Sequence, residues 1–399
     1  MASAQAHDGV PHLTLWGLTL RFLQFGSLAW GGPIAQIAML RRELVDREGW
    51  IDSARFNRTL AVYQALPGPE AQELCIYFGM LARGRIGGLL AGLCFLLPGF
   101  ALMLALSWFY LEVGIDSPVL VAAFAGGQAA VLALIVRGVH RIGARALHDR
   151  YLLLIAASAM AASLAAVPFV LPLAAAAACY MLVVRGRRTL GLLLLIASLL
   201  VAAVALFAPA APRVVAADGR DAPGEATIGQ LAATGLKAGA LTFGGAYTAI
   251  PFVEQDATGD DGWMTTDQFL DGLALSSLIP APLVIFATFV GFAGGGPLGA
   301  LVITVGMFLP AFAITLIGHR YLEAAVSDVR LHAALDGLTA GVVGLVGATA
   351  LQLAPTALGT LPAVAIFAGA LAVLYAWQAS AVIAVVMLAA GALGAVILR

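Results

Sequence analysis

Long apolar stretches, broken by short polar ones, run through almost the whole chain. Asp, Glu, Lys and Arg are absent from several long runs, which are residues 86–111, 151–184, 189–212, 272–318 and 337–398. A helix needs about 20 apolar residues to cross a bilayer, so each of the last two runs holds at least two spans. Hydrophobic residues make up 61% of the chain and charged residues 11%, unlike a soluble globular protein. The pattern predicts an all-α polytopic membrane protein.

The second half of the chain repeats the motifs of the first half at a constant spacing of 213 residues. The matched motifs are Trp30-Gly31-Gly32 with Phe243-Gly244-Gly245, Gly49-Trp50 with Gly262-Trp263, and Pro67-Gly68-Pro69 with Pro280-Ala281-Pro282. With a small drift in spacing, Leu97-Pro98 also matches Leu309-Pro310. A duplicated hydrophobic chain is typical of a secondary transporter whose two repeats enclose one site.

The repeat divides the chain into an N-terminal membrane repeat at 12–187, a joining helix and linker at 188–228, and a C-terminal membrane repeat at 229–399. About six apolar segments are expected in each repeat. They lie near 14–38, 59–82, 87–111, 118–136, 151–167 and 168–184 in the first repeat, and near 229–252, 270–292, 297–318, 333–353, 361–375 and 376–397 in the second. The segment 190–208 is left over as the joining helix.

Loop charge indicates that the two repeats have opposite orientations. The loop at 41–58 carries five arginines, whereas the matched stretch 254–271 has no Lys or Arg. Because cytoplasmic loops accumulate Lys and Arg, 41–58 is expected inside and 254–271 outside. The sequence therefore predicts two inverted repeats.

The number of full crossings stays open between two arrangements. If every apolar segment spans, the Arg-bearing loops 137–150 and 185–188 fall outside, against the charge rule. If the first two segments of each repeat are broken and re-entrant, these loops fall inside and the acidic stretches 112–117 and 254–271 fall outside. The second arrangement satisfies every charge bias, although 14–30 alone is nearly long enough to cross.

Pro67-Gly68-Pro69 must interrupt the helix expected at 59–82, because proline lacks an N–H donor and glycine permits unusual dihedrals. Broken backbone at membrane depth is tolerated where the freed groups line a cavity or a site. A half-helix opening at Pro69 presents free N–H groups and a partial positive charge, as does its counterpart at Pro282. Two such termini form a cradle for an oxyanion, whereas a plain proline kink only bends a helix. The same break in both repeats favours the site.

The glycine pairs Gly31-Gly32 and Gly244-Gly245 have two interpretations. Small residues allow close helix packing, and they also allow the helix to unwind locally beside a ligand. The sequence leaves both open.

Two basic residues lie in otherwise uncharged segments. Lys237 is the only charged residue between Glu225 and Glu254, and Arg21 is the only one between Asp8 and Arg41. A charge in a spanning helix costs at least ~2.5–3.5 kcal/mol, so it either serves function or reaches the interface along its long side chain. We expect Arg21 to reach the interface and Lys237 to face the substrate.

Two carboxyl groups fall on the half-helix after the first break. Glu70 follows Pro69 directly, and a carboxyl desolvated there is a candidate for proton coupling. The alternative is that Glu70 only complements the helix dipole. Glu73 is a second coupling candidate or the partner of a neighbouring cation, and Gln72 is placed among the binding residues.

Nothing in the sequence indicates an enzyme, a metal site or a cofactor. The six histidines are scattered at termini and in loops without ligand spacing. Cys75, Cys94 and Cys179 lie in apolar stretches and are expected to be free, buried thiols. No nucleic-acid partner is expected.

Four stretches resemble the chromate ion transporter family in its long-chain, two-repeat form. They are FGSLAWGGPIAQIAMLRREL, QALPGPEAQELCIYFG, FGGAYTAIPFV and DGLALSSLIPAPLVIFATFVGF. The resemblance covers about 20–112 and 235–318. The family's second break commonly reads Pro-Gly-Pro, whereas this chain has Ala281 in the middle.

The resemblance implies a secondary transporter that exports chromate across the bacterial inner membrane and confers chromate resistance, driven by membrane potential, proton exchange or both. Its expected partners are chromate or a similar oxyanion and the lipid bilayer, and a homodimer stays open. The expected binding residues are Gly31, Gly32, Pro67, Gly68, Pro69, Gln72, Lys237, Gly244, Gly245, Pro280, Ala281 and Pro282, with Glu70 and Glu73 as candidate coupling residues.

Two rival functions remain. One is the transport of another anion, such as sulfate or a small carboxylate, because sulfate has the charge and shape of chromate. The other is an intramembrane enzyme acting on lipid-linked substrates, which needs a catalytic acid cluster or a metal-binding motif that the sequence lacks.

Overall fold

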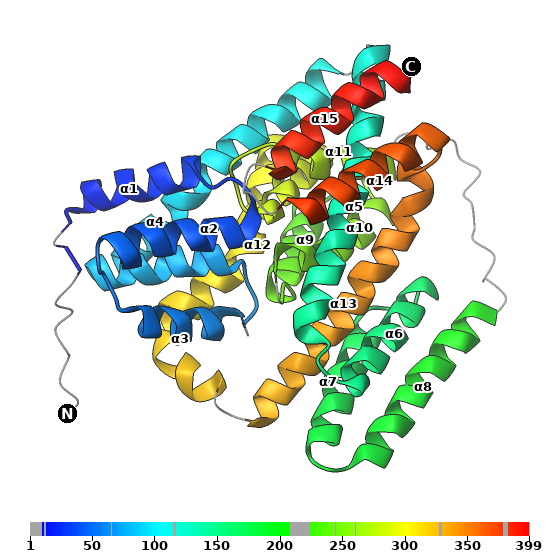
Figure 1. The fold of residues 1–399 in the computed structure, drawn as a ribbon, viewed down its shortest axis with the longest axis horizontal. Coiled ribbons are helices and arrows are strands. Elements are labelled where there is room, and N and C mark those ends of the chain that lie inside the picture. The colour runs from blue at the N-terminus through cyan, green and yellow to red at the C-terminus, as the bar shows by residue number, and fades with distance from the viewer. Residues whose placement is uncertain are drawn as a thin grey trace.

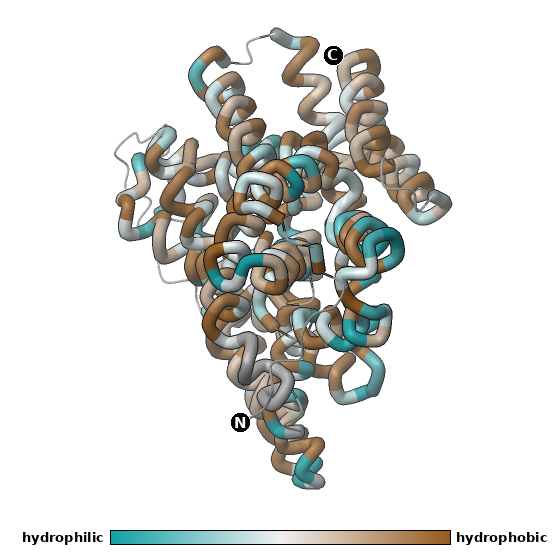
Figure 2. The backbone as a smooth tube through the Cα atoms, turned by 90° about the vertical axis from the view of Figure 1, so that its left-hand side faces the viewer, coloured by the Kyte–Doolittle hydropathy of each residue, from teal (hydrophilic) through white to brown (hydrophobic). Residues whose placement is uncertain are grey.

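The computed structural model describes residues 10–11, 13–64, 66–114, 117–207, 224–243, 245–259, 261–326, 329–377 and 382–398. Within these residues the chain forms helices and no strand (Figure 1). Hydrophobic residues dominate the tube, with hydrophilic residues in short stretches between them (Figure 2). Five of the described helical stretches are long and apolar enough to cross a membrane. The all-α polytopic fold predicted from the sequence is confirmed.

Each half of the chain builds the same series of helices. The first half contains α1 (Leu15–Ser27), α2 (Gly32–Leu40), η1 (Arg41–Arg47), α3 (Ser53–Gln64), α4 (Glu70–Trp108), η2 (Phe109–Val113), α5 (Pro118–Ala146), α6 (Arg150–Leu164), α7 (Val170–Val184) and the joining helix α8 (Arg188–Phe207). The second contains α9 (Ile228–Ala240), η3 (Ala246–Ala249), α10 (Ile250–Thr258), α11 (Thr266–Ser277), η4 (Leu283–Ile285), α12 (Phe286–Val326), α13 (Val329–Ala357), α14 (Leu361–Ala376) and α15 (Val382–Ile397). The domain boundaries drawn from the sequence stay a prediction.

The two series match in local geometry as well as in order. Thr14 caps α1 and Thr227 caps α9, each through its side-chain oxygen. Both helices then end on a leucine, Leu28 or Leu241, with φ −106° and ψ 8°. An N-cap hydroxyl satisfies a backbone N–H that the first turn leaves without a partner, so both helices begin for the same reason.

The long helices α4 and α12 are each broken at matched positions. Non-helical dihedrals occur at Arg83 and Gly84 in α4, and at Gly295 and Gly296 in α12. Gly84 has φ 61° and Gly296 has φ 60°, a left-handed conformation that favours glycine. Each long helix therefore consists of a short first part and a longer second part.

One hydrogen bond at each break shows where the chain returns after the short helices. Arg83 donates a hydrogen bond to the carbonyl oxygen of Leu13, and the Ala226 N–H donates to the carbonyl oxygen of Gly294 at 2.8 Å. In both repeats the chain thus returns, after four short helical pieces, to the side where it entered. α1 has 13 residues and spans only about 20 Å, too short to cross the hydrocarbon core. This geometry favours the re-entrant arrangement, and the number of full crossings stays a prediction.

The two repeats are inverted and hold each other in place. In Figure 1, α5 runs downwards to α6. The matched α13 begins beside α7 and runs upwards to α14. α5 packs against α14 and α15 of the second repeat, and α13 packs against α6 and α7 of the first. Each long helix is therefore held by the short helices of the other repeat.

Candidate functional site

Both helix breaks predicted from the sequence are present. α3 ends at Gln64 and α4 begins at Glu70, with Pro69 as its N-cap residue. In the second repeat α11 ends at Ser277, and the chain resumes as a short 3-10 turn after Pro282. The Gly68 N–H donates to the carbonyl oxygen of Thr242 at 2.8 Å, so the first break is bonded to the loop that follows α9.

The breaks also meet the opposite repeat through a reciprocal pair of small residues. A Cβ on Gly68 would lie 3.0 Å from the Cβ of Ala311, and a Cβ on Gly99 would lie 2.4 Å from the Cβ of Ala281. Gly99 and Ala311 occupy matched positions, as do Gly68 and Ala281. Each contact therefore combines one glycine with one alanine. This explains how the second break accommodates Ala281 where a glycine is expected.

The glycine pairs unwind the chain rather than pack helices together. Gly31, Gly32 and Gly245 have φ values of 89°, 76° and 130°. A Cβ on Gly245 would meet nothing within 4 Å, and one on Gly32 would meet only Ile383 at 3.9 Å. Local unwinding, one of the two interpretations left open above, is therefore the correct one at these positions. Gly244 lies outside the described residues.

A cavity of about 270 Å³ lies where the first break, α5, α13 and the Gly245 loop meet. We call it the basic cavity. Its polar and site-forming lining residues are Gln64, Glu70, Arg141, Arg145, His148, Gly245, Tyr247, His332, Asp336 and Thr339. The cavity thus joins residues from both repeats, including Glu70 and Gly245, which the sequence placed at the site.

Two arginines give this cavity its charge. Arg141 and Arg145 lie one turn apart on the same face of α5. Among the described residues, neither guanidinium forms a salt bridge. A guanidinium presents several N–H donors in a planar fork that suits an oxyanion. The cavity can therefore accept a small anion of two negative charges.

Asp149, the residue after the lining residue His148, is hydrogen-bonded outside the cavity, whose own acids are Glu70 and Asp336. Asp149 accepts hydrogen bonds from the backbone N–H groups of Tyr151 and Leu152 at 2.7 and 2.8 Å and from the Tyr180 hydroxyl at 2.8 Å. Burial acts to raise the pKa of Asp149, but the hydrogen bonds outweigh it and lower the pKa below its usual value. Asp149 therefore stays ionised while bonded to α6 and Tyr180, and it leaves Arg145 without a salt bridge.

Of the two half-helix carboxyl groups, Glu70 lines the basic cavity and Glu73 does not. Glu70 is 6% exposed and Glu73 is fully buried. One oxygen of Glu70 and both oxygens of Glu73 lack a hydrogen-bond partner in the described part of the protein. A buried carboxylate without partners is costly, which favours protonated side chains here. Gln72 donates to the carbonyl oxygen of Gly92 at 2.7 Å and does not line the basic cavity.

The counterpart of the basic cavity in the other repeat is closed. A space of about 20 Å³, the small cavity, is lined by Trp30, Gly31, Gly32, Leu134, Tyr247, Ser276, Ser277, Ile279, Ala281, Leu283, Ile383 and Ala384. At a spacing of 213, Ser277 matches Gln64 and Leu283 matches Glu70. A volume of 20 Å³ has room for about one water. The molecule is therefore open at one of two equivalent places.

A third cavity, of about 700 Å³, lies at the other end of α13. We call it the acidic cavity, because it is lined by Glu254, Asp256 and Asp261 among others. α13 contributes Thr339 to the basic cavity and Leu345 to the acidic cavity. Six residues of helix separate them, or about 9 Å along the axis. The two cavities thus approach each other from opposite ends of the same helix.

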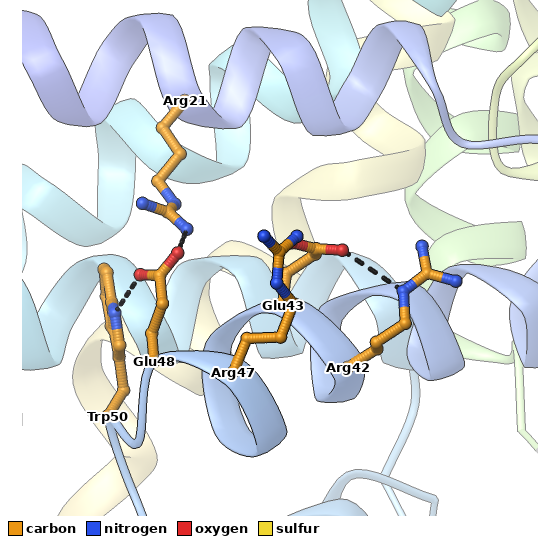
Figure 3. A network of polar contacts seen from close by, with 6 residues as sticks. All are labelled: Arg21, Arg42, Glu43, Arg47, Glu48 and Trp50. Carbon is orange, nitrogen blue, oxygen red and sulfur yellow. Dashed lines mark hydrogen bonds and ion pairs between the residues drawn. The ribbon is translucent and has the colours of Figure 1, made fainter.

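The two isolated cations form ion pairs. Arg21 pairs with Glu48, which also accepts a hydrogen bond from the Trp50 indole at 2.8 Å (Figure 3). Lys237 pairs with Asp256 at 2.5 Å and does not line the basic cavity. The structure therefore separates Lys237 from Glu70 and Gly245, with which the sequence analysis had grouped it.

The sequence analysis did not identify Arg141, Arg145 and Tyr247 as site residues. Arg137, Arg141 and Arg145 recur every four residues, a spacing that places them on one helix face and is visible in the sequence. Tyr247 lines both the basic and the small cavity, and its ring lies against Gly138. No sequence signal marks it, because its position depends on how η3 packs on α5.

Comparison with known proteins assigns this architecture to a family. A family model described as Chromate transporter matches residues 16–217 and 229–395. The chain belongs to the chromate transporter family. It is 55% identical over 389 residues to a chromate transport protein of Pseudomonas aeruginosa, covering 96% of this chain and 92% of that protein. The membership makes it a membrane transporter rather than an enzyme.

Two further relatives support the assignment over nearly the whole length. A chromate transport protein of Cupriavidus metallidurans is 30% identical over 367 residues, covering 90% of this chain and 88% of that protein. A probable chromate transport protein of Synechococcus elongatus is 29% identical over 383 residues, covering 92% of this chain and 91% of that protein. No solved structure matches the chain.

Proposed function

We propose that this protein exports chromate from the bacterial cytoplasm across the inner membrane and thereby confers chromate resistance. The observation that carries the proposal is the pair Arg141 and Arg145, which face the basic cavity without salt-bridge partners in the described chain. Relatives named chromate transport proteins supply the substrate. The distribution of Lys and Arg among the loops assigns the basic cavity to the cytoplasmic side.

In this proposal the basic cavity loads the dianion. Arg141 and Arg145 attract it electrostatically and donate hydrogen bonds to its oxygens. The unwound backbone at Gly245 and the half-helix that starts after Pro69 complete the cradle. Gly31, Gly32 and the second break line or adjoin the small cavity. They bind the anion when that cavity opens.

The energy source is the membrane potential, with a contribution from protons through Glu70. Moving a dianion out of a cell with a negative interior is downhill by about 2.3 kcal/mol per charge per 100 mV. Glu70 lies in the same cavity as the arginines, so its protonation is linked to the occupancy of that cavity. Exchange against an incoming proton requires Glu70 to bind a proton at the outer side and to release it to the cytoplasm as the anion is loaded.

Transport in vesicles of known sidedness tests the proposal. Inside-out vesicles containing the protein should accumulate labelled chromate when their interior is made positive, and vesicles without the protein should not. Accumulation only in right-side-out vesicles would instead indicate uptake. Competition by sulfate and molybdate, added at equal concentration, ranks the substrates, and a sulfate preference would assign the protein to the rival anion.

A further inference from the structure

Lys237 and Thr234 together occupy both oxygens of the Asp256 carboxylate. Lys237 Nζ lies 2.5 Å from Asp256 Oδ1, and the Thr234 hydroxyl donates to Oδ2 at 2.6 Å. The ammonium group also lies 5.0 Å from the centre of the Phe169 ring. Side-chain exposure is 22% for the lysine and 28% for the aspartate, so the pair is partly open to water.

The pair borders the acidic cavity. Thr234, Asp256 and Phe169 all line that cavity, where Glu254 and Asp261 add further negative charge. Lys237 is the only Lys or Arg in the sequence between Arg220 and Arg320. Lys237 is not itself a lining residue, but its ammonium group contacts two that are, Asp256 and Phe169, so it is the one cation from this part of the chain beside the cavity.

The first repeat shows that the fold does not require this lysine. At a spacing of 213, the positions of Lys237 and Asp256 hold Gln24 and Glu43. Glu43 is neutralised by Arg42 at 3.1 Å and Arg47 at 2.6 Å, both from its own helical segment (Figure 3). The matched acid thus has a partner without a cation from α1. A cation at this position is found in the second repeat alone, because α1 carries its cation, Arg21, three positions earlier and pairs it with Glu48.

We infer that Lys237 is an anion-binding residue on the exit side and that Asp256, with Thr234, keeps it in a low-affinity state. A dianion leaving through the acidic cavity must compete with Asp256 for the ammonium group. When it departs, Asp256 recovers the lysine, and the negative wall opposes the return of external anions. Asp256 therefore lowers the affinity for anions at the exit, which favours release over rebinding. This inference rests on the proposed function, because it takes the acidic cavity as the exit.

The decisive variant is Asp256→Asn, which keeps the shape of the side chain and removes its charge. Inhibition of efflux by external chromate is measured in right-side-out vesicles loaded with labelled chromate. Freeing Lys237 should lower the half-inhibiting external concentration about tenfold. Asp256→Glu retains the charge and should restore the wild-type value. If the Asn variant is not produced, Asp256→Ser makes the same change in charge.

Two controls separate the specific pair from general cavity charge. Glu254→Gln removes one negative charge from the same cavity, but Glu254 is hydrogen-bonded to Thr258 rather than to Lys237, so its shift should be far smaller. Adding Lys237→Gln to Asp256→Asn should abolish the gain, because the inferred binding group is then absent. Equal shifts in the Asp256 and Glu254 variants, or a gain that survives loss of Lys237, would overturn the inference.

A binding readout keeps this inference separate from the proposed function. Sulfate is added to purified protein, and the rise in thermal unfolding temperature is compared between wild type and Asp256→Asn. A larger rise in the variant, lost again in the double variant, supports the Lys237 site even if chromate export itself fails. No difference between the proteins contradicts the site even if export is confirmed.

Discussion

The basic cavity and the small cavity share several matched positions of the two repeats, yet one is open and the other is closed. Their volumes are about 270 and 20 Å³. Where the basic cavity has Glu70 and Gln64, the small cavity has Leu283 and Ser277. Two copies of one backbone plan therefore carry different chemistry at the same places.

The difference extends to the long helices. α5 and α13 match at a spacing of 211, so Arg141 corresponds to Gln352 and Arg145 to Thr356. Inversion of the repeats alone would give a molecule with the same chemistry on both sides of the membrane. The side chains at these few positions break that symmetry. The two repeats therefore share one backbone plan, whereas the side chains at these positions give the two sides of the molecule different chemistry.

The largest effect should come from removing the cations of the open cavity. We expect the double variant Arg141→Gln and Arg145→Gln to reduce chromate accumulation in inside-out vesicles about a hundredfold or more. Each charged hydrogen bond contributes roughly 1.5–3 kcal/mol, and two are lost. Arg150→Gln is the matched control, because Arg150 stacks on Tyr151 outside the cavity, and it should transport normally. Normal transport by the double variant would show that the open cavity is not the loading site.

A second prediction tests whether the small cavity opens during transport. A cysteine at Gln64 should react rapidly with a charged thiol reagent, and a cysteine at Ser277 about tenfold or more slowly, because it must wait for an opening that costs ~1.4 kcal/mol or more. The native cysteines are buried and provide a low background. Chromate should speed the reaction at Ser277→Cys from the outer side. Equal rates at both positions in the absence of substrate would contradict the closed state.

The features of this comparison that the sequence predicted are those with local backbone causes. The breaks at Pro67 and Pro280 follow from proline itself, whereas at Gly31 the sequence left packing and unwinding both open. The inversion followed from arginines counted along the loops. These signals need no knowledge of which helices touch.

The features that the sequence could not predict depend on contacts between distant segments. Lys237 was expected to face the substrate, and nothing in the sequence indicates that it pairs with Asp256 away from the basic cavity. Arg141 and Arg145 were counted as loop charge, because nothing in the sequence says that α5 faces the first break. The reciprocal Gly–Ala contacts, too, become visible only when the two repeats are placed together.

A third prediction uses that reciprocal contact. Gly99→Ala should destabilise the protein by about 1–3 kcal/mol, because the new methyl group would lie 2.4 Å from Ala281. Adding Ala281→Gly exchanges the two residues and should restore most of the stability and transport. Thermal unfolding in detergent measures the first effect, and vesicle transport the second. Failure of the double variant to recover would mean that the contact between the repeats is not the cause.

The smallest expected effect concerns Glu70, which has leucine as its counterpart in the closed cavity. Glu70→Gln keeps the shape of the side chain and removes its exchange of a proton. If Glu70 couples protons, the variant should lose the part of chromate flux that a pH gradient drives and keep the part that the membrane potential drives, a change of a few-fold overall. The two driving forces are imposed separately on the same inside-out vesicles, with an ionophore clamping the other. Survival of both fluxes would mean that Glu70 only complements the half-helix dipole. The membrane potential would then drive transport without coupling to Glu70.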